Sequence, residues 1–230
     1  MIKFRASGVA AVCGLHKYKK VSEELSEWVL RINRKQDTEG LSTKKDRCVE
    51  IVKEAILPFQ DIQLSLDTGT ASESQLLQVL PDEYRNVPEV VNEVSRVVNC
   101  TYGTAGEASI LKDIKADNVK SEYGIYVGSN YTIIGISDGV RGDQVVEVKN
   151  RKRIWATPPN YDIIQLRVYL KIYKKSTGVL VEKHPDGSVR ETIVIDDEDE
   201  WKKINIKLTR MAIQIKSMTI EDIKAIYAEC

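Results

Sequence analysis

The 230-residue sequence predicts an α/β fold in which a central mixed β-sheet is flanked by helices. Three observations carry this prediction. Short apolar stretches that alternate with period two lie in the middle of the chain, between glycine-rich turns. Longer stretches with an apolar residue every three or four positions lie on both sides of them. A content of 42% hydrophobic and 30% charged residues is typical of a chain that buries a core.

Helical patterns begin at the N-terminus, where residues 5–14 predict a helix of small residues that ends at Gly14. Ser22 is a capping residue, and the apolar stripe behind it predicts the next helix. Further helices are expected at 22–34, 44–57, 72–80, 88–99, 105–117, 161–176, 200–217 and 219–228. Pro58 and Pro81 end two of them. Residues 64–70 fit a short extended piece.

Strand patterns fill the middle of the chain. A hairpin is expected at 123–128 and 131–137, with a third strand at 144–149. A second hairpin, 178–183 with 189–196, turns at Asp186-Gly187 and joins the edge of the central sheet.

We interpret residues 1–230 as a single domain, with two small domains as the alternative. Its core is assigned to about 102–196, which includes the hairpin at 178–196, and the C-terminal helices follow it. Residues 44–100 hold no convincing chemistry and are interpreted as a helical insertion that covers the core or flanks a substrate groove.

The bulk properties exclude several classes of protein. A formal net charge of zero argues against a uniformly basic nucleic-acid coat protein, although a local basic cleft remains compatible with it. No apolar run is long enough to cross a bilayer or to act as a signal peptide, so no membrane partner is expected. The four cysteines are far apart and lack metal-ligand spacing. An intracellular protein with reduced thiols is therefore expected.

The candidate site lies in the stretch 134-IGISDGVRGDQVVEVKN-150. Asp138 follows an apolar run, and a glycine-rich turn leads to the strand that carries Glu147 and Lys149. Because side chains alternate along a strand, Glu147 and Lys149 share one face, while Val146 and Val148 face the other. One or two carboxylates with substrate phosphate make an ordinary Mg²⁺ site, and a nearby lysine can orient or deprotonate water. The alternative is a solvated strand face of alternating charges.

The segments G-I-S-D-G and V-E-V-K resemble the core of the PD-(D/E)XK nucleases, without the proline of that label. Three further patterns narrow the resemblance to the branch that holds phage lambda exonuclease, YqaJ-type viral recombinases and RecB-like nucleases. They are S-x-x-A-A-x-x-G-L-x-x-Y at 7–18, G-x-x-x-E at 103–107 and Q-x-x-x-Y at 165–169. The resemblance covers residues 1–20 and about 102–185, and it implies a restriction-endonuclease-like core.

The resemblance also implies roles for single residues. Asp138, Glu147, the Val148 carbonyl and Glu107 would bind Mg²⁺ or Mn²⁺; Lys149 would orient water; Gln165 would hold phosphate or water, with Tyr169 supporting it. Ser7 and Arg5 would lie near the phosphate of a DNA end. The basic residues Lys17, Arg151 and Arg153 are candidate phosphate contacts by their charge, with a solvated loop as the alternative.

These expectations combine into a metal-dependent deoxyribonuclease, and the family favours an exonuclease that processes double-stranded DNA ends in recombination, repair or viral replication. A ring-shaped homo-oligomer and a single-strand annealing or recombination partner are expected from the same resemblance. Two alternatives stay open. One is an endonuclease on the same core, including an RNA-cleaving one. The other is an inactive nucleic-acid-binding scaffold.

Overall fold

The computed structural model describes residues 1–118 and 123–230, and its strands form two mixed sheets. The first sheet has the order β1-β4-β3, with β1 (Ile2–Arg5) parallel to β4 (Tyr131–Gly135) and β3 (Gly124–Val127) antiparallel to it. The second has the order β2-β5-β6-β7-β8. Its strands are β2 (Asp117–Asn118), β5 (Gly139–Arg141), β6 (Gln144–Asn150), β7 (Thr177–Lys183) and β8 (Val189–Ile195). Among the described strands of this sheet, β6 and β7 run parallel, and the other neighbours are antiparallel.

The chain passes from the first sheet to the second through residues 136–138. Here the strand expected at 131–137 ends early, at Gly135. The Tyr173 hydroxyl accepts a hydrogen bond from the Ser137 amide at 3.2 Å and lies 3.5 Å from the Gly135 carbonyl. These contacts take up backbone groups that a continuous strand would have paired. The expected central sheet is therefore divided in two, and Asp138 lies at the division.

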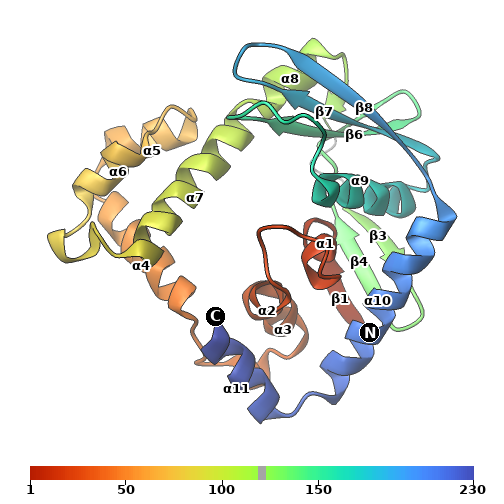
Figure 1. Ribbon diagram of the computed structural model, residues 1–230, viewed down its shortest axis with the longest axis horizontal. Helices are drawn as coiled ribbons and strands as arrows, with labels where there is room; N and C mark the ends of the chain where they lie inside the picture. Colours follow the sequence, from red (N-terminus) through yellow and green to blue (C-terminus); the bar gives the residue numbers. More distant parts are fainter. Residues whose placement is uncertain (119–122) are drawn as a thin grey trace.

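Helix α9 (Asn160–Tyr173) packs against both sheets and holds them together (Figure 1). Two glycines allow this close approach. A Cβ at Gly178 would lie 2.9 Å from Leu166, and one at Gly135 would lie 2.9 Å from the Tyr169 ring. The buried side of α9 joins the main hydrophobic core, which also contains Phe4, Tyr131 and Leu208.

The N- and C-terminal helices complete this half of the molecule. They are η1 (Ala6–Gly8), α1 (Val9–Val12), α2 (Val21–Glu24), a π-helical turn η2 (Leu25–Val29), α3 (Leu30–Asn33), η3 (Gln36–Thr38), α10 (Glu198–Ser217) and α11 (Ile220–Glu229). As predicted, the first helix stops before Gly14, whose φ of 65° suits glycine. Helix α10 lies against β1 and β4. The sequence pattern did not predict the short strand β1.

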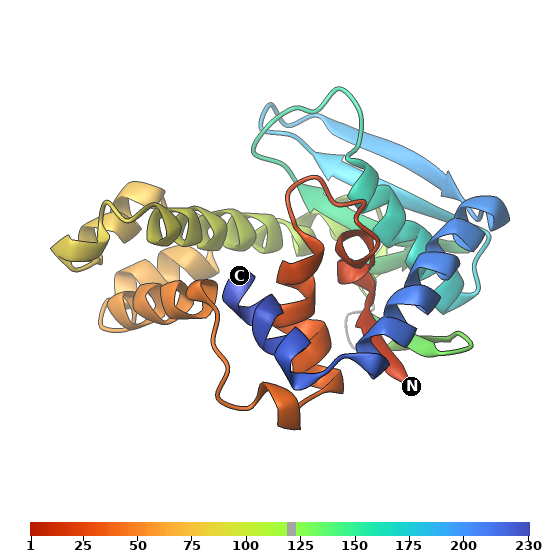
Figure 2. The ribbon, with the colours of Figure 1, turned by 60° about the horizontal axis from the view of Figure 1, so that its bottom comes forward.

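Residues 44–105 form a helical arm that projects away from the sheets in both views (Figures 1 and 2). Its elements are α4 (Lys44–Ile56), α5 (Gln60–Asp67), α6 (Glu73–Val79), η4 (Asp82–Tyr84) and α7 (Pro88–Ala105). The arm has its own hydrophobic core, with Val52, Leu76 and Val94 at its centre. Thr43 and Ser72 cap α4 and α6 through their side-chain oxygens. The helices expected at 44–57, 72–80 and 88–99 are confirmed.

Two expectations for this part of the chain are wrong. The extended piece expected at 64–70 belongs largely to helix α5, because Ile62 and Leu66 pack against the arm core at helical spacing. The helix expected at 105–117 is shorter, α8 (Glu107–Asp113), and α7 runs on to Ala105. Gly103 therefore lies inside α7. Within residues 1–118 and 123–230, no helix combines the length and the apolar character needed to span a bilayer.

Candidate active site

Strand β6 carries the predicted site, and its side chains alternate between two environments. Val146 and Val148 lie in an apolar cluster shared with α8 and β7. Glu147 and Lys149 lie on the other face, toward α9. This is the alternation that the sequence predicted. It separates a dry apolar layer on one side of the strand from a charged layer on the other.

Asp138 lies beside this charged layer. Its Oδ2 accepts a hydrogen bond from the Val148 amide at 2.8 Å, which fixes the carboxyl next to β6. The hairpin register pairs Gly139 with Val146 and so brings Asp138 level with Glu147. The charge of Asp138 is one of the causes that raise the pKa of Glu147. The two carboxyls that the sequence singled out therefore lie together.

Glu147 is the central side chain of the site, and only 2% of it is exposed. Its Oε1 accepts hydrogen bonds from Lys149 Nζ at 2.7 Å and from Gln165 Nε2 at 2.8 Å. The Gln165 amide also donates to the Tyr169 hydroxyl at 3.2 Å. The other carboxylate oxygen, Oε2, is buried and has no hydrogen-bond partner in the described part of the chain. A buried oxygen without a partner costs free energy unless a ligand binds to it.

The electrostatics agree with this geometry. Burial raises the pKa of Glu147 to about 8, helped by the charges of Asp138 and Asp162 and opposed by Lys149. Burial alone would lower the pKa of Lys149, but Glu147 and Asp162 raise it above its ordinary value. The lysine is therefore a fixed positive charge at neutral pH. The glutamate is the group whose charge responds to what binds next to it.

The donors at this position suit a hard divalent cation. Asp138, Glu147 and the Val148 carbonyl are oxygen donors, which Mg²⁺ and Mn²⁺ prefer. The expected third acid, Glu107, comes from another element. Within residues 1–118 and 123–230, no three histidine, cysteine, aspartate or glutamate side chains come close enough to hold a metal ion. Glu107 begins α8, which packs on the opposite, apolar face of β6. Its role as a ligand stays a prediction.

Two buried acids that the sequence interpretation missed extend the charged layer. Asp162, 3% exposed, lies 3.9 Å from Lys149 Nζ and pairs with Arg151 at 2.6 Å. Glu182, fully buried on β7, pairs with Arg151 at 2.8 Å and with Arg190 at 2.6 Å. A row of alternating charges therefore runs from the site toward the edge of the sheet. Asp162 stands one helical turn before Gln165 in the sequence, and that spacing could have signalled it.

Two arginines that were expected at DNA phosphates have partners inside the protein. Arg151 is not an exposed basic residue: its guanidinium is held between Asp162 and Glu182. Arg5 donates two hydrogen bonds, at 2.8 and 2.9 Å, to the buried carboxylate of Glu24. Both arginines thus balance buried acids, a role that the sequence did not suggest. Their contact with nucleic acid stays a prediction.

The remaining predicted contacts are accessible. Ser7 lines a cavity of about 270 Å³ together with Tyr169 and Trp28, so it lies close to the candidate site. Lys17 is exposed, with its ammonium 5.3 Å from the centre of the Tyr18 ring. Arg153 is exposed on the loop that follows β6. The structure thus gathers Asp138, Glu147, Lys149, Gln165 and Tyr169 at one place, with Ser7 nearby.

No protein-family model matches the chain, and no curated protein sequence does. Among solved structures, it resembles an alkaline exonuclease from Laribacter hongkongensis, with 14% identity over 70% of this chain and 94% of that chain, and a TM-score of 0.45. The complex of that exonuclease with dAMP matches at 13% identity over 77% of this chain and 90% of that chain, with a TM-score of 0.40. A phage-related exonuclease from Haemophilus somnus 129PT matches at 12% identity over 94% of this chain and 96% of that chain, with a TM-score of 0.41.

By their names these neighbours are exonucleases. Their low identities and TM-scores carry no residue role or activity across to this chain.

Proposed function

We propose that the chain is a divalent-metal-dependent deoxyribonuclease that hydrolyses phosphodiester bonds, acting as an exonuclease on double-stranded DNA ends. One observation carries the proposal. Glu147 is buried with one oxygen held by Lys149 and Gln165 and the other without a partner in the described residues, and Asp138 lies beside it. A divalent cation would complete that oxygen and offset two neighbouring negative charges.

In this proposal, Asp138, Glu147 and the Val148 carbonyl hold Mg²⁺ or Mn²⁺. A bound ion of this kind polarises a phosphoryl oxygen and lowers the pKa of water. The Asp138 carboxyl is oriented in advance by the Val148 amide. Because this bond leaves Asp138 little freedom to turn, the cation would meet a carboxylate that is already in place.

Lys149 and Gln165 act on the other side of Glu147. Lys149 stays positively charged, so its ammonium orients the attacking water and offsets charge that develops on the phosphoryl group. Gln165 donates both of its amide hydrogens, to Glu147 and to Tyr169, so it would contact substrate by exchanging the Tyr169 bond for a phosphate oxygen, or would accept a hydrogen bond from water through its Oε1. Tyr169 supports that amide through its hydroxyl. Ser7, on the cavity that Tyr169 also lines, is a candidate phosphate contact.

The activity is tested by incubating the chain with linear double-stranded DNA, covalently closed circular DNA and RNA. Each substrate is supplied with Mg²⁺, with Mn²⁺ or with a chelator. Loss of linear DNA with survival of circular DNA is the expected result. Nicking of circular DNA would replace the exonuclease with an endonuclease, and cleavage of RNA alone would change the substrate. Absence of cleavage with every substrate and metal would overturn the proposal in favour of a binding scaffold.

Lys149→Ala tests the mechanism. We expect cleavage to fall by about 10²–10⁴-fold, the usual contribution of a positioned proton-transfer or charge-stabilising group. Circular dichroism should show an unchanged fold. Lys202→Ala is the matched control, because Lys202 is also paired to a carboxylate, Asp199, but is exposed on α10. Full activity of Lys149→Ala would remove the lysine from the mechanism.

A further inference from the structure

Lys149 lies between two carboxylates. Its Nζ is 2.7 Å from Glu147 Oε1 and 3.9 Å from Asp162 Oδ1. Asp162 belongs to the first turn of α9 and is 3% exposed. One of these acids is a proposed metal ligand and the other is not. The lysine therefore has a first partner that a cation would engage and a second partner that stays available.

Asp162 is held firmly where it lies. Its Oδ2 accepts a hydrogen bond from Arg151 at 2.6 Å. Arg151 also donates to Glu182 at 2.9 Å, and Glu182 is fixed in turn by Arg190. Since Glu182 is fully buried, this chain of ion pairs cannot relax into solvent. The oxygen that faces Lys149 is thus held in a rigid position, 3.9 Å from the ammonium.

A cation on Glu147 creates a conflict for Lys149. The ammonium and the cation carry charge of the same sign, and both would seek the same carboxylate. A lysine side chain is a compact charge on a flexible stem, so it moves to whichever acid is free. Without a second acid, it would either compete with the cation or leave the site.

We propose that Asp162 is a positioning residue that takes over Lys149 when Glu147 engages a divalent cation, so that the ammonium stays in the site without opposing the metal. The inference rests on the proposed function, because it assumes a cation at Glu147. Asp162 itself touches neither metal nor substrate in this scheme. Since Arg151 already neutralises much of its charge, its direct attraction for a cation is small.

The test is a double-mutant cycle on Mn²⁺ binding, measured by calorimetry on the full chain without DNA. Asp162→Asn leaves Lys149 with Glu147 as its one ion-pair partner among the described residues, so Mn²⁺ affinity should fall about tenfold. In the Lys149→Gln background no ammonium competes, so the same change should alter affinity by less than about twofold. Equal factors in the two backgrounds would mean that Asp162 acts through its own charge, and would overturn the inference.

Asp196 offers a matched control for this cycle, because it also pairs with a lysine: Lys171 of α9 lies 2.8 Å away. Asp196→Asn should change Mn²⁺ affinity in neither background. If Asp162→Asn does not fold, the cycle is run with Asp162→Asn combined with Arg151→Met, which removes both members of the buried pair. If the unmodified chain binds no Mn²⁺, the proposed function fails and the inference fails with it. Binding with equal factors in both backgrounds rejects the positioning role alone.

Discussion

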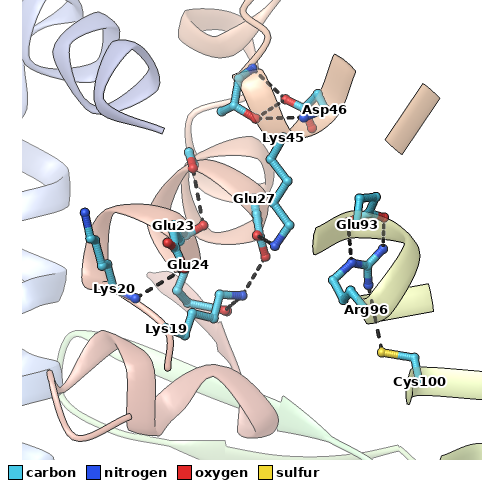
Figure 3. A network of polar contacts seen from close by, with 12 residues as sticks. Lys19, Lys20, Glu23, Glu24, Glu27, Lys45, Asp46, Glu93, Arg96 and Cys100 are labelled. Carbon is cyan, nitrogen blue, oxygen red and sulfur yellow. Dashed lines mark hydrogen bonds and ion pairs between the residues drawn. The ribbon is translucent and has the colours of Figure 1, made fainter. Parts of the chain in front are cut away.

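Two glutamates in this chain, Glu24 and Glu147, are almost equally buried, at 1% and 2% exposure, but they differ in how completely they are paired. Both oxygens of Glu24 are occupied. Arg5 donates to each of them, and Lys19 lies 2.7 Å from Oε2. Figure 3 shows Glu24 beside Lys19 within a network that continues through Glu27 to Lys45. Glu147 has one occupied oxygen and one without a partner in the described residues.

This difference separates a structural acid from a candidate functional one. When both oxygens of a buried carboxylate are paired, ion pairs inside the protein compensate for its loss of hydration. Glu182 is such a case, because it pairs with Arg151 and Arg190. A buried carboxylate with an open oxygen lacks this compensation, and a ligand can complete it. Residue type and burial do not distinguish the two cases, whereas the number of partners does.

The largest expected contrast comes from Glu147→Gln. The change keeps the shape of the side chain and removes its charge. Cleavage should fall by at least about a hundredfold, because mutating even a residue that only hydrogen-bonds to a metal ligand lowers metal affinity or activity by about 10–100-fold. Thermal stability should be little changed at pH 7 and higher above pH 8, where the substitution removes an incompletely paired buried charge. Nuclease assays and thermal melting measure both effects. Substantial Mg²⁺-dependent cleavage by this variant would place the metal elsewhere.

Glu24→Gln should behave in the opposite way. It leaves Arg5 and Lys19 without their buried partner, so the free energy of unfolding should fall by about 1–3 kcal/mol. Cleavage by the folded fraction should fall far less than in Glu147→Gln. Urea denaturation measures the stability. An unchanged midpoint would show that the pairing around Glu24 does not contribute to the fold.

The raised pKa of Glu147 predicts a proton linked to metal binding. Since its pKa rises from 4.5 to about 8, the carboxyl is mostly protonated at pH 7 in the metal-free chain, and a cation must displace that proton. Mn²⁺ affinity should therefore rise by up to about tenfold per pH unit below pH 8 and level off above it. Calorimetry in two buffers of different ionisation enthalpy should count about one proton at pH 7, and none for Glu147→Gln.

The proton on Glu147 also affects the free energy of unfolding, which should fall as the pH rises. Between pH 4.5 and about 8, the folded chain holds a proton that the unfolded chain has lost. This stabilising contribution is fully present below pH 4.5 and is lost as the pH rises through about 8. Wild-type stability should therefore fall relative to Glu147→Gln over that range. A constant difference between the two proteins would contradict the raised pKa.

The smallest effect is expected from Tyr169→Phe. The hydroxyl accepts one hydrogen bond from Gln165 at 3.2 Å, and its loss leaves the contact of Gln165 with Glu147 in place. Cleavage should fall by only about 2–10-fold, which corresponds to one neutral hydrogen bond. Gln165→Ala removes both contacts and should cost more. An equal loss in the two variants would show that the tyrosine acts in its own right.

The positions of Asp138, Glu147 and Lys149 depend on local sequence patterns and could be predicted. Period-two alternation put Glu147 and Lys149 on one face of β6, and the glycine-rich turn brought Asp138 beside them. Asp162 was missed because acids are common in the first turn of a helix, where they interact favourably with the helix dipole. Its ion-pair partner, Arg151, lies on another element, so the pairing could not be predicted from the local sequence. Glu182 reaches the same charged layer only because β7 pairs with β6, which no local pattern reveals.

Differences in the fold have similar causes. The stretch 131–137 looks continuous in the sequence, and only the Tyr173 hydroxyl, 36 residues away, shows why the strand ends. The stretch 64–70 alternates apolar and polar residues as a strand would, but the arm core buries Ile62 and Leu66 and thereby selects the helix. Tertiary contacts decided both cases.

The two environments of β6 have a consequence for how the sheet assembles. A slip of one residue against β7 would turn Glu147, Lys149 and Arg151 into the apolar layer beside α8 and would turn Val146 and Val148 into the charged layer. Burying three charges among these aliphatic side chains is far more costly than any gain from a shifted ladder. Glu147 and Lys149, which are proposed to act in DNA cleavage, therefore also restrict β6 and β7 to a single register.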